Sequence, residues 1–423
     1  MKKNATYLFR RIQEKLWFRP VIFCFISILG ALLAQVADKT DLQKLVPDLK
    51  IESIIELLNI ISSSMLVIAT FTVGSMISAF AAASTTATPR SFNLIITDDV
   101  SRNSLSAFIG SFIFSIVALI AVKNGYYGKA GLFTLFIITL LFFTLVILTF
   151  LRWVERISRL GRMGHTIKLI ENVTKIALKK RLKSPTMGGI KIDSNITNTN
   201  HVYSDDIGYI LSIDMEMLQE IAEKSNAIFT INALPGKFVS LNIPILHIHY
   251  NEQKTDEAID FDTIRKSFNI GDTRSFDDDP RFGSITLSEI ASRALSPAVN
   301  DPGTAIQIIN SHVRLFSLFD EVQKQETNNE IMYSKIAVPE LVLADLFEDA
   351  FRPIARDGAA NIEVMIRLQK AFKSLSKISY PTIKEVAKQH SNEAYIRAEK
   401  TINHNEDISE LKKECILDAK LQE

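Results

Sequence analysis

Four long stretches without a charged residue dominate the first 151 positions of this 423-residue chain. They cover residues 20–37, 57–89, 103–122 and 130–151, with lengths of 18, 33, 20 and 22 residues. About 20 apolar residues in a helix span the hydrocarbon core of a bilayer. The first stretch has no small-residue cleavage site of a signal peptide, so we expect it to be retained as a helix. The sequence therefore predicts a four-helix transmembrane domain over residues 1–151.

Positive charges flank this domain unevenly. Six Lys or Arg residues and one acid precede the first stretch, and residues 152–183 hold ten Lys or Arg against two acids. Lys123 and Lys129 lie on the opposite side but are outnumbered. Because translocation of Lys and Arg is disfavoured, we expect a multi-pass protein of the bacterial inner membrane with both termini in the cytoplasm.

The second stretch carries polar and small residues on one side. At 100° per residue they fall within roughly 80° of arc, which could line a water-filled path. The pore-lining candidates are Asn59, Ser63, Thr70, Gly74, Thr85 and Thr88. Close packing of helices through small residues explains the same pattern and is the favoured reading, because Gly74, Ser78 and Ala82 are spaced small-xxx-small.

Residues 152–183 are expected to continue the fourth helix as a basic amphipathic juxtamembrane helix. Arginines and tryptophans at this depth are typical of contacts with lipid headgroups. The headgroup candidates are Arg152, Arg156, Arg159, Arg162, Trp17 and Trp153. A basic vestibule below a pore would have the same composition.

The remaining chain has the composition of a soluble domain. Residues 184–203 are rich in Ser, Thr, Asn and Gly and are expected to form a linker or loose hairpin. Residues 204–423 predict strands near 207–213, 227–232, 239–241, 245–250 and 331–338, with helices in between and after them. The expected fold is thus an α-helical membrane protein followed by a cytoplasmic α/β (α+β) domain with a helical C-terminal part.

Motifs of catalysis and cofactor binding are missing from the sequence. It has no Walker loop, HExxH, GxSxG or dinucleotide-binding fingerprint, so we expect no enzyme, no catalytic residues and no cofactor. His247 and His249 could share a strand face, but no Cys or acidic cluster completes a metal set near them. The net charge of +1 gives no reason to expect a nucleic-acid partner.

The densest group of turn and helix-start signals lies between Asp277 and Ala305. Thr286 with Glu289 predicts a capping box, and Asp301 followed by Pro302 predicts another helix start. Helix ends close to arginines could hold an anionic ligand. The ligand-binding candidates are Arg281, Arg293, Asn300 and Asp301, although helix stop and start signals explain these residues equally well.

Several short motifs resemble one known family. They are Leu16-Trp17-Phe18-Arg19-Pro20, Ala87-Thr88-Pro89-Arg90, Pro235-Gly236-Lys237-Phe238-Val239, Asp279-Pro280-Arg281-Phe282-Gly283 and the run from Ala294 to Pro302. Together they resemble the bacterial family of predicted membrane proteins called domain of unknown function 2254. The resemblance implies an inner-membrane protein with a cytoplasmic domain and implies no particular activity.

Two functions remain open from the sequence. One is a homo-oligomeric ion channel with a path lined by the second helix and a cytoplasmic regulatory domain, since four spans are too few for one protomer to enclose a pore. The other is a membrane-anchored ligand sensor or scaffold without conductance. The expected partners are the lipid bilayer, further copies of the chain and a small ion or anionic ligand.

Overall fold

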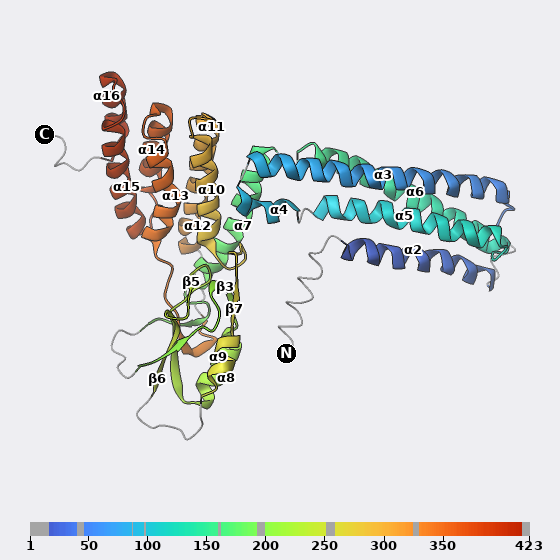
Figure 1. Ribbon diagram of the computed structural model, residues 1–423, viewed down its shortest axis with the longest axis horizontal. Helices are drawn as coiled ribbons and strands as arrows, with labels where there is room; N and C mark the ends of the chain where they lie inside the picture. Colours follow the sequence, from blue (N-terminus) through green and yellow to red (C-terminus); the bar gives the residue numbers. More distant parts are fainter. Residues whose placement is uncertain are drawn as a thin grey trace. The chain divides into compact units, whose positions relative to one another are not determined.

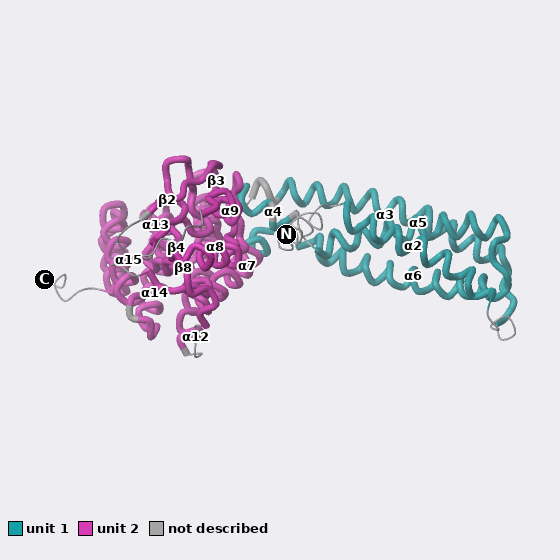
Figure 2. Tube along the Cα trace, turned by 90° about the horizontal axis from the view of Figure 1, so that it is seen from below, with its two compact units in different colours: residues 1–166 teal, residues 167–423 magenta. Residues whose placement is uncertain are grey.

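The computed structural model describes residues 17–39, 46–86, 88–96, 99–159, 162–192, 199–250, 259–324 and 330–416. Contacts divide the chain into an N-terminal unit of residues 1–166 and a C-terminal unit of residues 167–423 (Figure 2). The basic residues expected before the first span at positions 2–15 lie outside the described residues.

The N-terminal unit is a bundle of four long helices. These are α2 (Phe18–Val36), α3 (Ile51–Thr86), α5 (Asp99–Lys123) and α6 (Lys129–Ile157), joined by the short elements η1 (Ala37–Lys39), η3 (Pro89–Ser91) and α4 (Phe92–Ile96) (Figure 1). All four are long and apolar enough to cross a membrane. The expectation of four long apolar helices in this region is therefore confirmed. At about 1.5 Å per residue, the 36 residues of α3 extend over roughly 50 Å, more than the bilayer core.

Helix α5 is the central helix of the bundle. Half of its 18 most apolar consecutive residues are buried, compared with 17–28% of the equivalent residues in the other three helices. Small residues allow the close approach, because a β-carbon on Gly110 would lie 3.1 Å from Phe23 Cβ and from Ser27 Oγ of α2. Phe114 of α5 stacks on Phe142 of α6 with ring centroids 4.5 Å apart, which fills the interior between these helices.

Polar contacts fasten both ends of the bundle. The Asp38 carboxylate accepts from the backbone N–H groups of Gly128 and Gly131, each at 2.7 Å, and so caps the first turn of α6. At the other end, Arg19 donates to Asn103 Oδ1 at 2.7 Å and to Asp99 Oδ1 at 2.5 Å. Each contact joins residues at least 80 positions apart in the sequence.

The fourth span does not continue through residue 183 as one helix. Helix α6 ends at Ile157, and α7 (Met163–Lys183) is a separate helix. Ser158 caps α6, and its hydroxyl donates to the Glu155 carbonyl at 2.8 Å. A serine hydroxyl competes for a helix carbonyl and favours a helix end. The expectation of an unbroken juxtamembrane helix is therefore wrong.

The C-terminal unit contains two small sheets. Its strands are β1 (Gly189–Ile190), β2 (Thr199–Tyr203), β3 (Gly208–Ile213), β4 (Ala227–Ile231), β5 (Phe238–Val239), β6 (Pro244–Tyr250), β7 (Phe268–Gly271) and β8 (Tyr333–Ala337). The five-stranded sheet has the order β1-β8-β4-β6-β2, and the three-stranded sheet has the order β5-β3-β7. Helices α8 (Met215–Lys224) and α9 (Phe261–Lys266) belong to the same region. The strands expected after residue 204 are confirmed within about two residues, the usual uncertainty of element ends.

The segment expected to be a linker contributes to the larger sheet. Strand β1 pairs in parallel with β8, and β2 pairs antiparallel with β6, so both edges of this sheet come from residues 184–203. Val202 of β2 is 1% exposed and belongs to the core between the sheets. Pairing with strands distant in sequence therefore orders the two ends of a segment whose composition is typical of loops.

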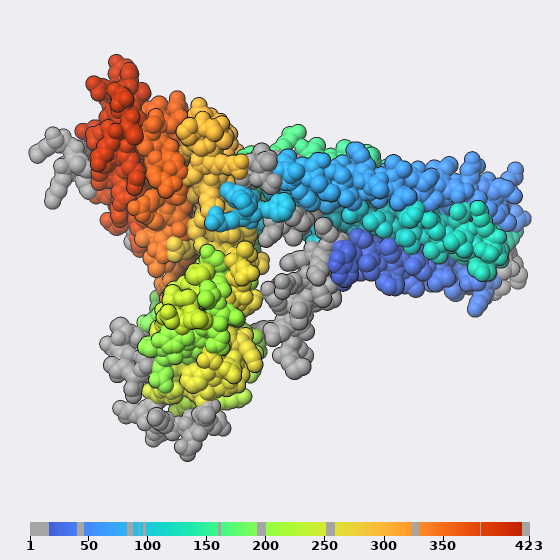
Figure 3. All heavy atoms as spheres, in the orientation of Figure 1, coloured from blue at the N-terminus to red at the C-terminus, as the bar shows by residue number. Residues whose placement is uncertain are grey.

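Besides α7, α8 and α9, the described residues of the C-terminal unit form seven further helices. They are α10 (Pro280–Ala294), α11 (Pro302–Phe316), α12 (Leu318–Lys324), α13 (Leu343–Asp357), α14 (Ile362–Leu375), α15 (Pro381–Glu399) and α16 (Asn405–Glu414). Figure 3 shows the strand region in green and yellow and the later helices in orange and red, gathered at different ends of the unit. The buried rings of Phe316, Phe347, Phe351 and Phe372 form the core of the helical part.

Helix α10 begins earlier than a capping box at Thr286 requires. Asp279 is its N-cap and Pro280 its first residue, whereas Thr286 lies inside the helix and donates to the Phe282 carbonyl at 2.8 Å. The expected Thr286–Glu289 capping box is wrong because the Asp-Pro pair upstream already starts the helix. The second expectation is confirmed, since Asp301 caps α11 and Pro302 is its first residue.

Candidate functional site

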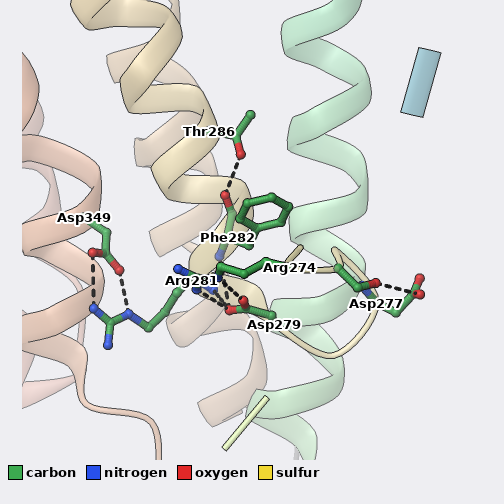
Figure 4. A network of polar contacts seen from close by, with 8 residues as sticks. Arg274, Asp277, Asp279, Arg281, Phe282, Thr286 and Asp349 are labelled. Carbon is green, nitrogen blue, oxygen red and sulfur yellow. Dashed lines mark hydrogen bonds and ion pairs between the residues drawn. The ribbon is translucent and has the colours of Figure 1, made fainter. Parts of the chain in front are cut away.

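The start of α10 is a network of buried and half-buried charges (Figure 4). Asp279 is 3% exposed, and its Oδ1 accepts from the backbone N–H groups of Arg281 and Phe282, each at 3.2 Å. Arg274 grips the same carboxylate through Nε at 2.6 Å and a terminal nitrogen at 3.0 Å. The Arg274 guanidinium also lies 5.3 Å from the centre of the Phe282 ring. Both oxygens of the Asp279 carboxylate are thus hydrogen-bonded, and the positive charge of Arg274 balances its negative charge.

Arg281 points away from this cap, toward α13. It holds Asp349 with Nε at 2.6 Å and a terminal nitrogen at 3.2 Å (Figure 4). Its other terminal nitrogen lies 2.6 Å from Asp345. Burial lowers the pKa of the Arg281 guanidinium, but the hydrogen bond and charge of Asp349 outweigh that effect and raise it. With two carboxylates on one guanidinium, Arg281 has no positive charge left over for an anionic ligand.

The other ligand candidates lie at the far end of α10. Arg293 is in its last turn, and Asn300 and Asp301 follow in the connection to α11. Twelve residues separate Arg281 from Arg293, which is about 18 Å along a helix axis. The structure therefore does not bring these two arginines together.

The connection between α10 and α11 is specified by backbone geometry. Asn300 has a φ of +50°, a left-handed conformation that asparagine tolerates well. The Asp301 N–H donates to the Ala294 carbonyl at 2.8 Å, while its carboxylate accepts from the Thr304 N–H at 3.1 Å and hydroxyl at 2.6 Å. These Thr304 hydrogen bonds lower the pKa of Asp301. Asn300 and Asp301 thus have a structural task in turning the chain.

Glycines allow other segments to contact α10 closely. A β-carbon on Gly236 would lie 2.2 Å from Asp279 Oδ2, and one on Gly283 would lie 1.7 Å from Thr174 Oγ1 of α7. Helix α7 is further held by a two-pronged ion pair between Glu171 and Arg314, with both distances 2.6 Å. The α10 region therefore contacts the turn at residues 234–237, helix α7 and helix α13.

The polar stripe of α3 faces away from the other helices of its own bundle. Asn59, Ser63, Thr70 and Gly74 are all exposed, and the space around a β-carbon on Gly74 is open for 4 Å. The side chain of Thr85 lies outside the described ones. Thr88 is not part of the stripe, because α3 ends at Thr86 and Thr88 is a buried cap of η3. The stripe consequently packs against none of the described helices of the same chain.

The headgroup candidates divide in a similar way. Trp17, Arg152, Arg159 and Arg162 are exposed, and Arg156 is half-buried. Trp153 is only 1% exposed and packs edge-on against Phe71 of α3, with ring centroids 6.0 Å apart. The expected position of the Trp153 ring at the membrane interface is not observed. Its side chain lies inside the helical bundle instead.

Comparisons with known proteins identify relatives without assigning an activity. The family model described as "Predicted membrane protein (DUF2254)" matches residues 13–374. Uncharacterised proteins of Mycobacterium tuberculosis (Rv1290c) and Mycobacterium bovis (Mb1321c) are each 31% identical over 106 residues, or 24% of this chain. The match covers 20% of the length of those relatives. No solved structure matches the chain.

Proposed function

Because the chain belongs to the DUF2254 family of predicted membrane proteins, we propose that it is a homo-oligomeric ion channel of the bacterial inner membrane. Its path is lined by α3, and the C-terminal unit regulates it from the cytoplasm. The family assignment supports only the membrane location, so the channel rests on the arrangement of α3.

The outward polar face of α3 is the observation that carries the proposal. Asn59, Ser63 and Thr70 are exposed on one side of α3, while Ile54, Leu58, Ile61 and Met65 on the other side are buried. The interior of the protomer is filled by side chains such as Phe114 and Phe142. A path for ions therefore belongs between protomers, with copies of α3 around a symmetry axis.

Self-association also follows from the physics of the exposed face. Ser63 and Thr70 hydroxyls donate to carbonyls of their own helix, at 2.8 Å to Asn59 and 2.8 Å to Val67, so they tolerate either lipid or a neighbouring helix. Gly74 offers a flat surface on which another helix can pack closely. The exposed carboxamide of Asn59 gains most from leaving lipid for water or a partner helix.

A specific observation favours the second candidate, a membrane-anchored sensor or scaffold. Leu66 and Ile77 lie on the same exposed side of α3, with exposures of 49% and 62%. Such side chains narrow and dry a path, and they suit a packed oligomer interface at least as well. In this alternative the spans anchor and assemble the protein, and no ions cross.

Ion flux distinguishes the two candidates. The purified chain is reconstituted in liposomes, and K⁺ and Cl⁻ fluxes are measured with the wild type, Thr70→Leu and Gly74→Leu. Val21→Leu on α2, which is 41% exposed, is the matched control. A channel predicts flux in the wild type that changes at Thr70 and Gly74 and not at Val21. Oligomers that form normally but carry no flux for either ion would support the sensor or scaffold and contradict the channel.

The orientation has its own test. We propose that the exposed arginines after α6 face the cytoplasm and that the end containing Asn124 faces outward, since Lys and Arg favour the inner side. In a chain with Cys24 and Cys415 replaced by Ser, a membrane-impermeant maleimide added to intact cells should label Asn124→Cys and spare Ser184→Cys. Labelling with the reverse pattern would invert the topology.

A further inference from the structure

Three histidines gather on one face of the five-stranded sheet. His201 of β2 lies directly opposite His247 of β6, and His249 follows two residues later on the same strand. Alternate residues of a strand point to the same side, so all three belong to one face. Val202, Leu246 and Ile248, which alternate with them, are buried in the core on the other side. The histidines are therefore accessible while their backbone is fixed by the sheet.

Two of the imidazoles already aim nitrogen atoms at each other. His201 Nδ1 and His247 Nδ1 are 2.7 Å apart, with the rings 4.8 Å between centroids and inclined at 76°. Two nitrogens this close share either a proton or a cation. Tetrahedral ligands of an ion at about 2.0–2.1 Å lie about 3.3 Å from each other, so the pair needs to open by only about 0.6 Å.

The third histidine is hydrogen-bonded to the strand on the other side of β6. His249 Nε2 lies 3.0 Å from Thr230 Oγ1 of β4, whereas His201 is on β2, the opposite neighbour of β6. The His249 ring therefore has to rotate away from Thr230 before it can join the pair.

Among the described residues, no three His, Cys, Asp or Glu side chains stand in ligating positions. The His201–His247 pair is already in place, and His249 completes a set of three only when its ring leaves Thr230 and turns toward the pair.

We propose that His201, His247 and His249 bind a divalent transition-metal ion of the Zn²⁺ type, with water in the fourth position. Imidazole nitrogen suits Zn²⁺, Cu²⁺ and Ni²⁺, and three histidines with an open fourth position form an established kind of zinc site. The ion would connect β2, the edge strand, to β6. The site is independent of whether the protein conducts ions.

The test uses the full chain in detergent, purified without a histidine tag. After dialysis, Zn²⁺ affinity is measured by competition with a chromophoric chelator, and Co²⁺ replaces Zn²⁺ to report the coordination geometry by its visible spectrum. The wild type is expected to bind one Zn²⁺ per chain, with Zn²⁺ raising the midpoint of thermal unfolding. His201→Gln and His247→Gln are expected to weaken binding more than 100-fold, and His249→Gln at least tenfold.

Two further variants make the result specific. Thr230→Val removes the hydrogen bond that holds the His249 ring toward β4, so this variant is expected to bind Zn²⁺ at least as tightly as the wild type. His404→Gln, which changes an exposed histidine at the start of α16, is expected to leave binding unchanged. A wild type that binds Zn²⁺ no tighter than His201→Gln or His247→Gln, or a tetrahedral Co²⁺ spectrum that persists without them, would overturn the proposal and leave a proton-sharing pair.

Discussion

Asp279 lies directly against the backbone of Gly236, where a β-carbon would fall 2.2 Å from its Oδ2 and 2.7 Å from its Oδ1. The two residues come from motifs more than 40 positions apart, the turn at 234–237 and the start of α10. Asp279 cannot withdraw, because Arg274 and two backbone N–H groups hold its oxygens. One contact thus couples the smaller sheet to the helical part of the C-terminal unit.

Gly236→Ala is expected to destabilise the protein by about 3 kcal/mol or more, since it combines a strained backbone with a steric clash. Gly236 has a φ of +90°, and the added methyl group meets a fixed carboxylate. Thermal unfolding in detergent measures the change. Gly303→Ala is the control, because its β-carbon meets only the exposed Asp301 at 3.3 Å. Equal effects of the two substitutions would refute the contact.

Arg281→Gln is expected to cost about 2 kcal/mol, because it leaves the half-buried Asp349 carboxylate without its partner. Arg281→Lys should be intermediate, since an ammonium cannot reproduce the two-pronged contact. Combining Arg281→Gln with Asp349→Asn should cost less than the sum of the single changes. Arg367→Gln, an exposed arginine on α14, is the control. Additive effects would show that the pair contributes nothing.

His312 is expected to make the protein sensitive to acid. It is fully buried, which lowers its pKa from 6.5 to about 3, although the nearby Glu171 opposes the shift. Between pH 6.5 and about pH 3, His312 is protonated in the unfolded chain and neutral in the folded chain. Above pH 6.5 the titration of His312 therefore does not change the free energy of unfolding. Below pH 6.5 the free energy of unfolding falls by about 1.4 kcal/mol per pH unit.

Thermal unfolding at pH 7, 6 and 5 checks this prediction. His312→Asn is expected to unfold at a lower temperature at pH 7 and to lose less stability on acidification than the wild type. His404→Gln, at an exposed histidine, should keep the slope of the wild type. An unchanged slope in His312→Asn would assign the acid sensitivity to other groups.

Asp38→Ala is expected to destabilise the helical bundle by about 1–2 kcal/mol, because it removes the cap of α6. Asp38→Asn keeps an acceptor and should cost less. Asp48→Ala is the matched control at the same end, since the 86% exposed Asp48 only pairs with Lys129. Its removal should change stability by less than about 1 kcal/mol. Similar losses at Asp38 and Asp48 would contradict the capping role.

Features that depend on neighbouring residues could be predicted from the amino-acid sequence. Four spans follow from uninterrupted apolar length, and the start of α11 follows from Asp301-Pro302, because each is decided within a few helical turns. Five of the described strands after residue 204 were predicted for the same reason, whereas β7 (Phe268–Gly271) was not. The prediction of a capping box at Thr286 was wrong because the sequence contains two helix-start signals. The upstream signal, Asp279-Pro280, is the one that begins the helix.

Contacts between residues distant in sequence became known from the three-dimensional fold. It gave Arg281 two carboxylates from α13, turned Trp153 into the bundle, and left Asn59, Ser63 and Thr70 of α3 exposed among the described residues. It also made a strand from a loop-like segment and so placed His201 opposite His247, 46 residues away. A strand pairing joins residues at any separation, and its stability comes from hydrogen bonds and burial that no local pattern records.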